Sequence, residues 1–136
     1  MKNIVLLALA LTILGGCKKF VESVQEDLVI NAMTDGQWRV TSLKRDVNDV
    51  TAGFSPYSFQ FKKDKTVEAI NGGAVESRGT WNGNAENRTI AASFSNANST
   101  LMLLNGTWQI TKNSWTFVEA TQTVNNEVRT LRLDKQ

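Results

Sequence analysis

The sequence predicts an all-β protein, a small eight-stranded up-and-down antiparallel barrel preceded by a signal peptide and a short helix. One observation is a repeated glycine–tryptophan pair, at Gly36–Trp38, Gly79–Trp81 and Gly106–Trp108. Each pair is typical of a strand that begins at a bend and points a large ring to one face. A second observation is a series of short alternating segments, separated by turn residues, that continues to the end of the chain. Closing such strands into a barrel leaves no exposed edge.

A helix is expected at Phe20–Met33, where apolar residues recur at the spacing of one helical face. Asp35 and Gly36 end this helix and lead into the strands. The eight strands that we expect are Gln37–Arg45, Tyr57–Lys62, Thr66–Ile70, Val75–Asn82, Arg88–Phe94, Thr107–Lys112, Trp115–Thr121 and Glu127–Asp134. The turn at Asn71–Gly73 is a typical hairpin connection.

One apolar segment, Leu101–Leu104, does not alternate. The Asn105–Gly106 pair after it is a good hairpin turn, which favours a strand. Leucine and methionine are good helix formers, however, and the segment has no β-branched residue. We therefore expect a short helical or irregular plug at this position rather than a ninth strand.

The first residues have the pattern of a secretory leader. A positive start precedes the apolar run Ile4–Leu14, which is too short to cross a bilayer, since about 20 residues are needed. Leu14–Cys17 resembles the bacterial lipobox, and this resemblance implies that Cys17 is lipidated after cleavage. The chain then divides into a lipoprotein signal peptide at residues 1–16, a lipid-anchored spacer with the short helix at 17–33, and the barrel at 34–136.

The composition excludes several chemistries. The chain has no histidine and one cysteine, so neither a Ser-His-Asp triad nor an imidazole metal site is possible. The leader holds one of the 15 basic residues, and its loss leaves 14 basic residues against 13 acidic ones, which gives no electrostatic basis for nucleic-acid binding. Glu119 shares the predicted face of Trp115, but a pair with Arg129 or Arg132 is simpler than a role as a buried acid. We expect no enzyme, no cofactor and no metal.

Residues 34–136 resemble the lipocalin-like lipoproteins of the Bacteroidota. Besides the lipobox and the spacer helix, the resemblance is carried by Gly36, Trp38, Gly79, Trp81, Leu104, Asn105, Trp108, Ile110 and Leu131–Lys135. It implies a cell-envelope protein that Cys17 anchors to the outer membrane, with Trp38 at the closed end of the barrel under Arg129 or Arg132. Two lysines, rather than acidic residues, follow the cysteine, and in this group that favours an anchor facing the periplasm over surface display.

Two functions remain open. In the first, the barrel binds a small apolar ligand, since pockets are mostly apolar. The candidate interior residues are Trp38, Phe59, Phe61, Trp81, Phe94, Met102, Trp108, Trp115 and Phe117. In the second, the rings fill the barrel, and the protein recognises or inhibits a protein partner through its longest loops, Asp46–Pro56 and Ser95–Thr100.

The lipobox generates the first prediction, which concerns Cys17. In Cys17→Ser, the acceptor thiol is lost, so labelled palmitate should no longer be incorporated, and the protein should remain uncleaved or become soluble. Metabolic labelling and membrane fractionation measure both effects. Unchanged labelling and membrane partition in the variant would contradict lipidation at this residue.

Overall fold

The computed structural model describes residues 28–136, and its elements follow the predicted order. Residues 28–34 are helical. The elements after them are β1 (Trp38–Arg45), β2 (Asn48–Asp49), the 3-10 helix η1 (Thr51–Phe54), β3 (Tyr57–Phe61), β4 (Thr66–Asn71), β5 (Ala74–Asn84), β6 (Thr89–Phe94), α2 (Ser99–Met102), β7 (Gly106–Asn113), β8 (Phe117–Val124) and β9 (Glu127–Lys135). The signal peptide, Cys17 and the first part of the expected helix lie outside the described residues.

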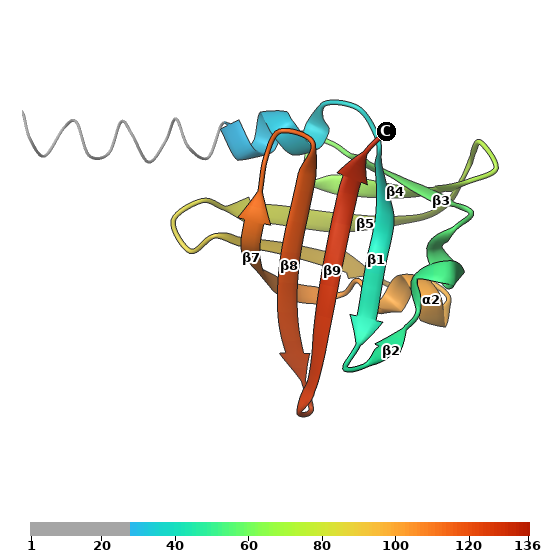
Figure 1. The fold of residues 1–136 in the computed structure, drawn as a ribbon. Coiled ribbons are helices and arrows are strands. Elements are labelled where there is room, and N and C mark those ends of the chain that lie inside the picture. Colours follow the sequence, from blue (N-terminus) through green and yellow to red (C-terminus); the bar gives the residue numbers. More distant parts are fainter. Residues whose placement is uncertain (1–27) are drawn as a thin grey trace, which may run out of the picture.

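All strands are antiparallel and form one closed barrel. The strand order is β2-β1-β3-β4-β5-β6-β7-β8-β9, and β1 also pairs with β9. Eight of these strands make the barrel wall, and β2 is a short extra strand at the end of β1 (Figure 1). The predicted fold class, an eight-stranded up-and-down barrel, is confirmed. The extra strand β2 was missed, because its two residues lie within the segment predicted as the loop Asp46–Pro56.

Closure is uneven around the barrel. Strand β1 pairs with β9 along its whole length, from Trp38 opposite Lys135 to Arg45 opposite Arg129. Its ladder with β3 consists of one residue pair, Trp38 opposite Phe59. Beyond that pair, β1 and β3 diverge, and η1 lies between them in the chain. The barrel is therefore closed by its first and last strands and is weakest between β1 and β3.

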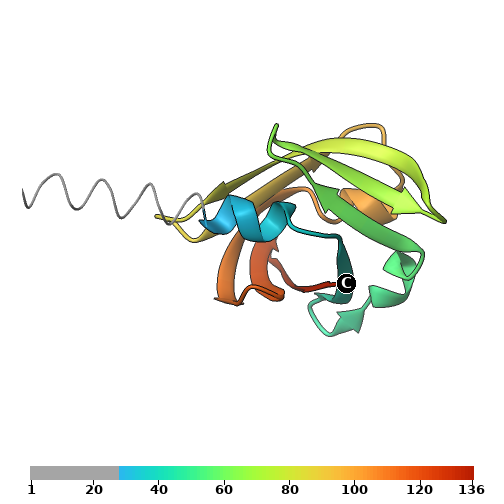
Figure 2. The same cartoon turned by 90° about the horizontal axis from the view of Figure 1, so that it is seen from above.

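Because the strands run up and down, alternate connections lie at opposite ends of the barrel. We call one end the helix end; it comprises residues 28–37, the turns at 62–65, 85–88 and 114–116, and the chain terminus at 135–136. The helical segment lies across this end (Figure 2). We call the other the loop end; it comprises β2, η1, α2 and the turns at 72–73 and 125–126.

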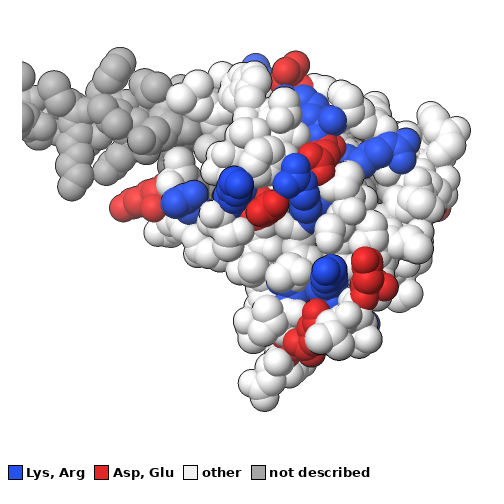
Figure 3. Space-filling model, in the orientation of Figure 1, with Lys and Arg blue, Asp and Glu red and all other residues white. Residues whose placement is uncertain are grey.

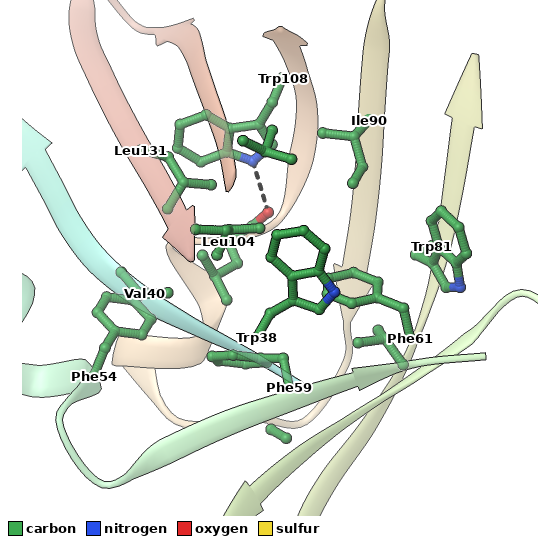
Figure 4. Packing of buried hydrophobic residues seen from close by; sticks show 14 of the residues in the cluster. Trp38, Val40, Phe54, Phe59, Phe61, Trp81, Ile90, Leu104, Trp108 and Leu131 are labelled. Atoms are coloured by element: carbon green, nitrogen blue, oxygen red, sulfur yellow. Dashed lines mark hydrogen bonds between the residues drawn. The ribbon is translucent and has the colours of Figure 1, made fainter. Parts of the chain in front are cut away.

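The three repeated tryptophans fill the core from both ends. Trp38, Trp81 and Trp108 are all buried, and each indole N–H donates to a backbone carbonyl, as a buried indole requires. The acceptors are Met33 for Trp38 at 2.9 Å, Lys62 for Trp81 at 2.8 Å and Leu104 for Trp108 at 2.9 Å. Figure 4 shows the last of these bonds among the packed core residues. Each ring therefore ties a connecting segment to the barrel wall.

The glycines of these motifs are needed for local geometry. Gly106 has a φ of 106°, a conformation that residues with a Cβ rarely adopt. Gly79 lies against the neighbouring strand β6, where an added Cβ would collide with the carbonyl oxygen of Ser93. One glycine thus permits the bend before a strand, and the other permits two strands to approach closely.

The packing of Trp38 generates the second prediction. Its side chain is fully buried, with 0% exposure, so Trp38→Ala should lower the free energy of unfolding by about 3–5 kcal/mol. Urea denaturation followed by circular dichroism measures the change. Trp115→Ala is the matched control, because Trp115 is 51% exposed and its loss should cost less than about 1 kcal/mol. Equal losses in the two variants would contradict the placement of Trp38 in the core.

Candidate functional site

The barrel interior contains six of the nine residues predicted to line it. Trp38, Phe59, Phe61, Trp81, Phe94 and Trp108 are all buried. They pack against one another rather than around an open space. The Phe61 and Trp81 ring centroids are 5.3 Å apart in an edge-to-face arrangement, and those of Phe59 and Phe94 are 6.4 Å apart. Such contacts stabilise an aromatic core beyond the burial of its area.

The remaining interior space is a small apolar cavity. Its volume is about 30 Å³, and its lining includes Phe59, Phe94, Trp108 and Leu131. Pockets that bind small molecules have volumes of about 300–1,000 Å³. At the loop end, Phe54 from η1 and Leu101 from α2 are buried in the core. The short helical or irregular plug expected at Leu101–Leu104 is therefore present: α2 ends at Met102, and Leu101 and Leu104 are both buried in the core.

Three predicted interior residues lie elsewhere. Met102 is 43% exposed at the end of α2, and Trp115 is 51% exposed in the turn before β8. Phe117 lies on the outer face of β8, where the Arg132 guanidinium is 4.4 Å from its ring centroid. The expectation that these three side chains face the interior is wrong. The inward set of β8 contains Val118 and Ala120, because the register of β8 with β9 places them opposite the buried residues Leu133 and Leu131. The strand therefore has the opposite parity from that predicted.

The same change of parity places Glu119 on the outer wall. Its carboxylate accepts a hydrogen bond of 2.7 Å from Arg132, which also binds Asp134 at 2.9 Å. Figure 3 views this wall and shows basic and acidic side chains interleaved across it. Glu119 therefore has the salt-bridge partner expected from the sequence and lies far from the buried position that an acid catalyst would need.

The structure brings the two candidate recognition loops together at the loop end. A Cβ added at Gly53 of η1 would lie 3.3 Å from Thr100 of α2, so the two helical turns are in close contact. An open groove of about 360 Å³ runs between them, lined by Arg45, Val50, Ala52, Gly53, Ser99, Thr100 and Leu103. Near it, Val47 is 92% exposed at the tip before β2. The sequence identified both loops, but it carried no signal that they meet.

A cluster of charged side chains lies on the barrel wall at the loop end. The Glu127 carboxylate accepts two hydrogen bonds from Arg45, at 2.9 and 3.0 Å, and one from Arg129 at 2.6 Å. Arg129 also donates to Gln122, at 3.3 Å, on the neighbouring strand β8. The hydrogen bonds from Arg45 and Arg129 lower the pKa of Glu127 to about 2. This cluster joins β1, β8 and β9 and lies beside the groove.

At the helix end, the basic residue over the Trp38 ring is Lys135. Its ammonium nitrogen is 5.1 Å from the Trp38 ring centroid and 5.5 Å from that of Trp115. The expectation of Arg129 or Arg132 in this position is wrong. Both arginines lie earlier in β9, opposite Arg45 and Ser42 of β1, whereas Lys135 is the register partner of Trp38. The pairing of β1 with β9, which the sequence does not display, decides which cation covers the ring.

Residues 28–136 lack two kinds of feature. No helix in this range is long and apolar enough to cross a membrane. No group of three or more histidine, cysteine, aspartate or glutamate side chains in it is arranged to hold a metal ion.

The fold and its filled interior define a small closed β-barrel protein. A crystal structure of a DUF4847 family protein from Bacteroides vulgatus is similar to it, with a TM-score of 0.55 and 14% sequence identity. The match covers 79% of this chain and 99% of that chain. At this identity the similarity shows the fold alone. No family model matches the sequence, and no curated protein matches it.

The third prediction concerns Glu127. Because its pKa of about 2 in the folded protein lies below its ordinary value of 4.5, the folded state favours the ionised form. Its stabilising contribution is therefore complete above about pH 4.5 and is lost as the pH falls to about 2. The difference in unfolding free energy between wild type and Glu127→Gln should be largest near pH 6 and disappear near pH 2, as measured by urea unfolding across this range.

The matched control is Glu86→Gln, which changes an exposed carboxylate in the turn at residues 85–88. It should change the free energy of unfolding at pH 6 by less than about 0.5 kcal/mol, as is usual for a surface substitution. A Glu127→Gln difference that stayed constant from pH 6 to pH 2 would show that the carboxylate charge contributes nothing to this cluster.

Proposed function

We propose that this protein is a lipid-anchored, lipocalin-like lipoprotein of the cell envelope that recognises a protein partner through its loop end. The observation that carries the proposal is the filled interior. The cavity of about 30 Å³ is roughly a tenth of the smallest pockets that bind small molecules. Of the two functions left open by the sequence, recognition through the loops therefore has more support than transport of an apolar ligand.

The loop end has the features of a recognition surface. Exposed apolar side chains lie on its elements, with Val47 before β2, Val75 on β5, Met102 on α2 and Val128 on β9. Between η1 and α2 it also has the groove of about 360 Å³. The aromatic core holds these loops rigidly, since Phe54 and Leu101 are buried. A preformed surface of this kind binds a partner at a lower cost in conformational entropy.

The position of residue 28 also supports the loop end as the recognition surface. Residue 28 lies at the helix end, so a lipid on Cys17 would attach the barrel to the membrane from the side opposite the loop end. The loop end would then face away from the bilayer. The lysines that follow Cys17 favour the periplasmic side. The lipocalin-like assignment is supported by the buried Trp38 under Lys135, although Lys135, not an arginine, is the covering cation.

The fourth prediction tests recognition at the loop end. A photocrosslinking amino acid that replaces Val47, which is 92% exposed, should form a defined adduct with a protein partner in intact cells. Val128→Asp places a charge on the same surface and should reduce the yield of this adduct. The matched control has the crosslinker at Asn82, an exposed residue on the outer wall of β5, and should give no adduct.

Two results would contradict the proposal. One is the same adduct pattern from Val47 and Asn82. The other is saturable, one-to-one binding of a fluorescent fatty acid that Trp108→Phe weakens, because a filled barrel has no space for such a chain. We expect the fatty acid titration to remain flat.

A further inference from the structure

The exposed tryptophan at the helix end is held in place by Lys135. Trp115 is 51% exposed, and the Lys135 ammonium lies 5.5 Å from its ring centroid. The same ammonium lies over the buried ring of Trp38, and the Lys135 side chain is itself only 13% exposed. A cation between two aromatic rings stabilises both positions. The Trp115 ring is thus stabilised at the surface without being buried.

The helix end is also basic. Its turns and the strand ends beside them contribute Arg39, Lys62, Lys63, Lys65, Arg88, Lys112 and Lys135, against Asp35, Asp64, Glu86 and Asp134. Two of these lysines are paired, Lys62 with Glu68 on β4 and Lys135 with Asp35. The loop end has the opposite balance, with Lys44, Arg45 and Arg129 against Asp46, Asp49, Glu76 and Glu127. The protein therefore has a positive end, and it is the end that carries Trp115.

The helix end also has exposed apolar side chains. Leu28 is 52% exposed where the described chain begins, and it lines an open groove with Val29, Ile110 and Asn113. Tryptophan and leucine beside lysines are suited to the boundary between headgroups and acyl chains, where an amphipathic ring has one apolar side and one hydrated side. Lysines near an anionic membrane surface each contribute about 1 kcal/mol to binding.

We propose that the helix end is a docking surface for an anionic phospholipid bilayer, with Trp115 at the level of the headgroups. The proposal rests on the proposed anchor at Cys17, which lies eleven residues before Leu28. Even a fully extended segment of this length spans only about 40 Å, so the anchor holds this end of the barrel close to the membrane. The lipid and the barrel surface then bind the same bilayer, and the barrel has a fixed orientation on it.

The test uses the mature lipidated protein in vesicles of phosphatidylethanolamine and phosphatidylglycerol that contain brominated phospholipid. All four tryptophans lie in the described residues, and Trp38, Trp81 and Trp108 are at most 3% exposed. Quenching of tryptophan emission by the brominated lipid therefore reports on Trp115. We expect quenching in the wild type, its loss in Trp115→Phe, and protection of Trp115 from iodide in the water phase.

Lysine-to-glutamate variants test the electrostatic contribution to membrane docking. Lys63→Glu and Lys112→Glu should each weaken the docked state about fivefold or more, as expected for about 1 kcal/mol per lysine. Lys44→Glu at the loop end is the matched control and should leave quenching unchanged. Vesicles of phosphatidylcholine alone should give less quenching than the anionic vesicles, with no difference between the lysine variants and the wild type.

The outcomes separate this proposal from the anchor. Protein that floats with the vesicles while Trp115 stays accessible to iodide and unquenched by lipid overturns the docking surface and leaves the anchor intact. Protein that does not float overturns the anchor, and the docking surface with it. Shielding of Trp115 that depends on protein concentration and needs no vesicles would assign this end to a second copy of the chain and overturn membrane docking.

Discussion

The structure depends on how β1 is shared between its two neighbours. Strand β1 pairs with β9 along its length but with β3 at only one residue pair. The barrel wall therefore has an opening at the loop end, where β1 and β3 do not pair. This opening is filled by η1 and α2, whose buried Phe54 and Leu101 complete the core. The candidate recognition surface therefore results from incomplete strand pairing: the segments that fill the core on one side face the solvent on the other.

The buried tryptophans link the barrel core to the chain segments at both ends. The indole N–H of Trp38 binds the carbonyl of Met33 and that of Trp108 binds the carbonyl of Leu104, so one ring holds the helical segment and the other holds the chain after α2. Buried polar groups are costly unless paired, and each of these bonds satisfies a donor that the core would otherwise leave unpaired. A single core thus orients the helix end and the loop end relative to each other.

The two ends differ in charge and in exposed apolar residues, and this difference suggests separate roles. The helix end combines Trp115 and an excess of basic residues with Leu28, where the described chain begins. The loop end combines exposed valines with a groove between η1 and α2. In the proposed arrangement, one end contacts the membrane, the other end recognises a partner, and the filled barrel is the rigid spacer between them.

The sequence alone determined the barrel, its strands and the helical plug, because glycine–tryptophan pairs, two-residue alternation and helix propensity are local signals. It also identified six of the buried rings. It did not determine the face of β8, since a period of two gives alternation without saying which set points inward. The register of β8 with β9 decides that Phe117 and Glu119 face outward. Only the tertiary structure decided that Lys135 covers Trp38, that the two loops meet, and that the rings leave no pocket, because each depends on register and packing between residues far apart in the chain.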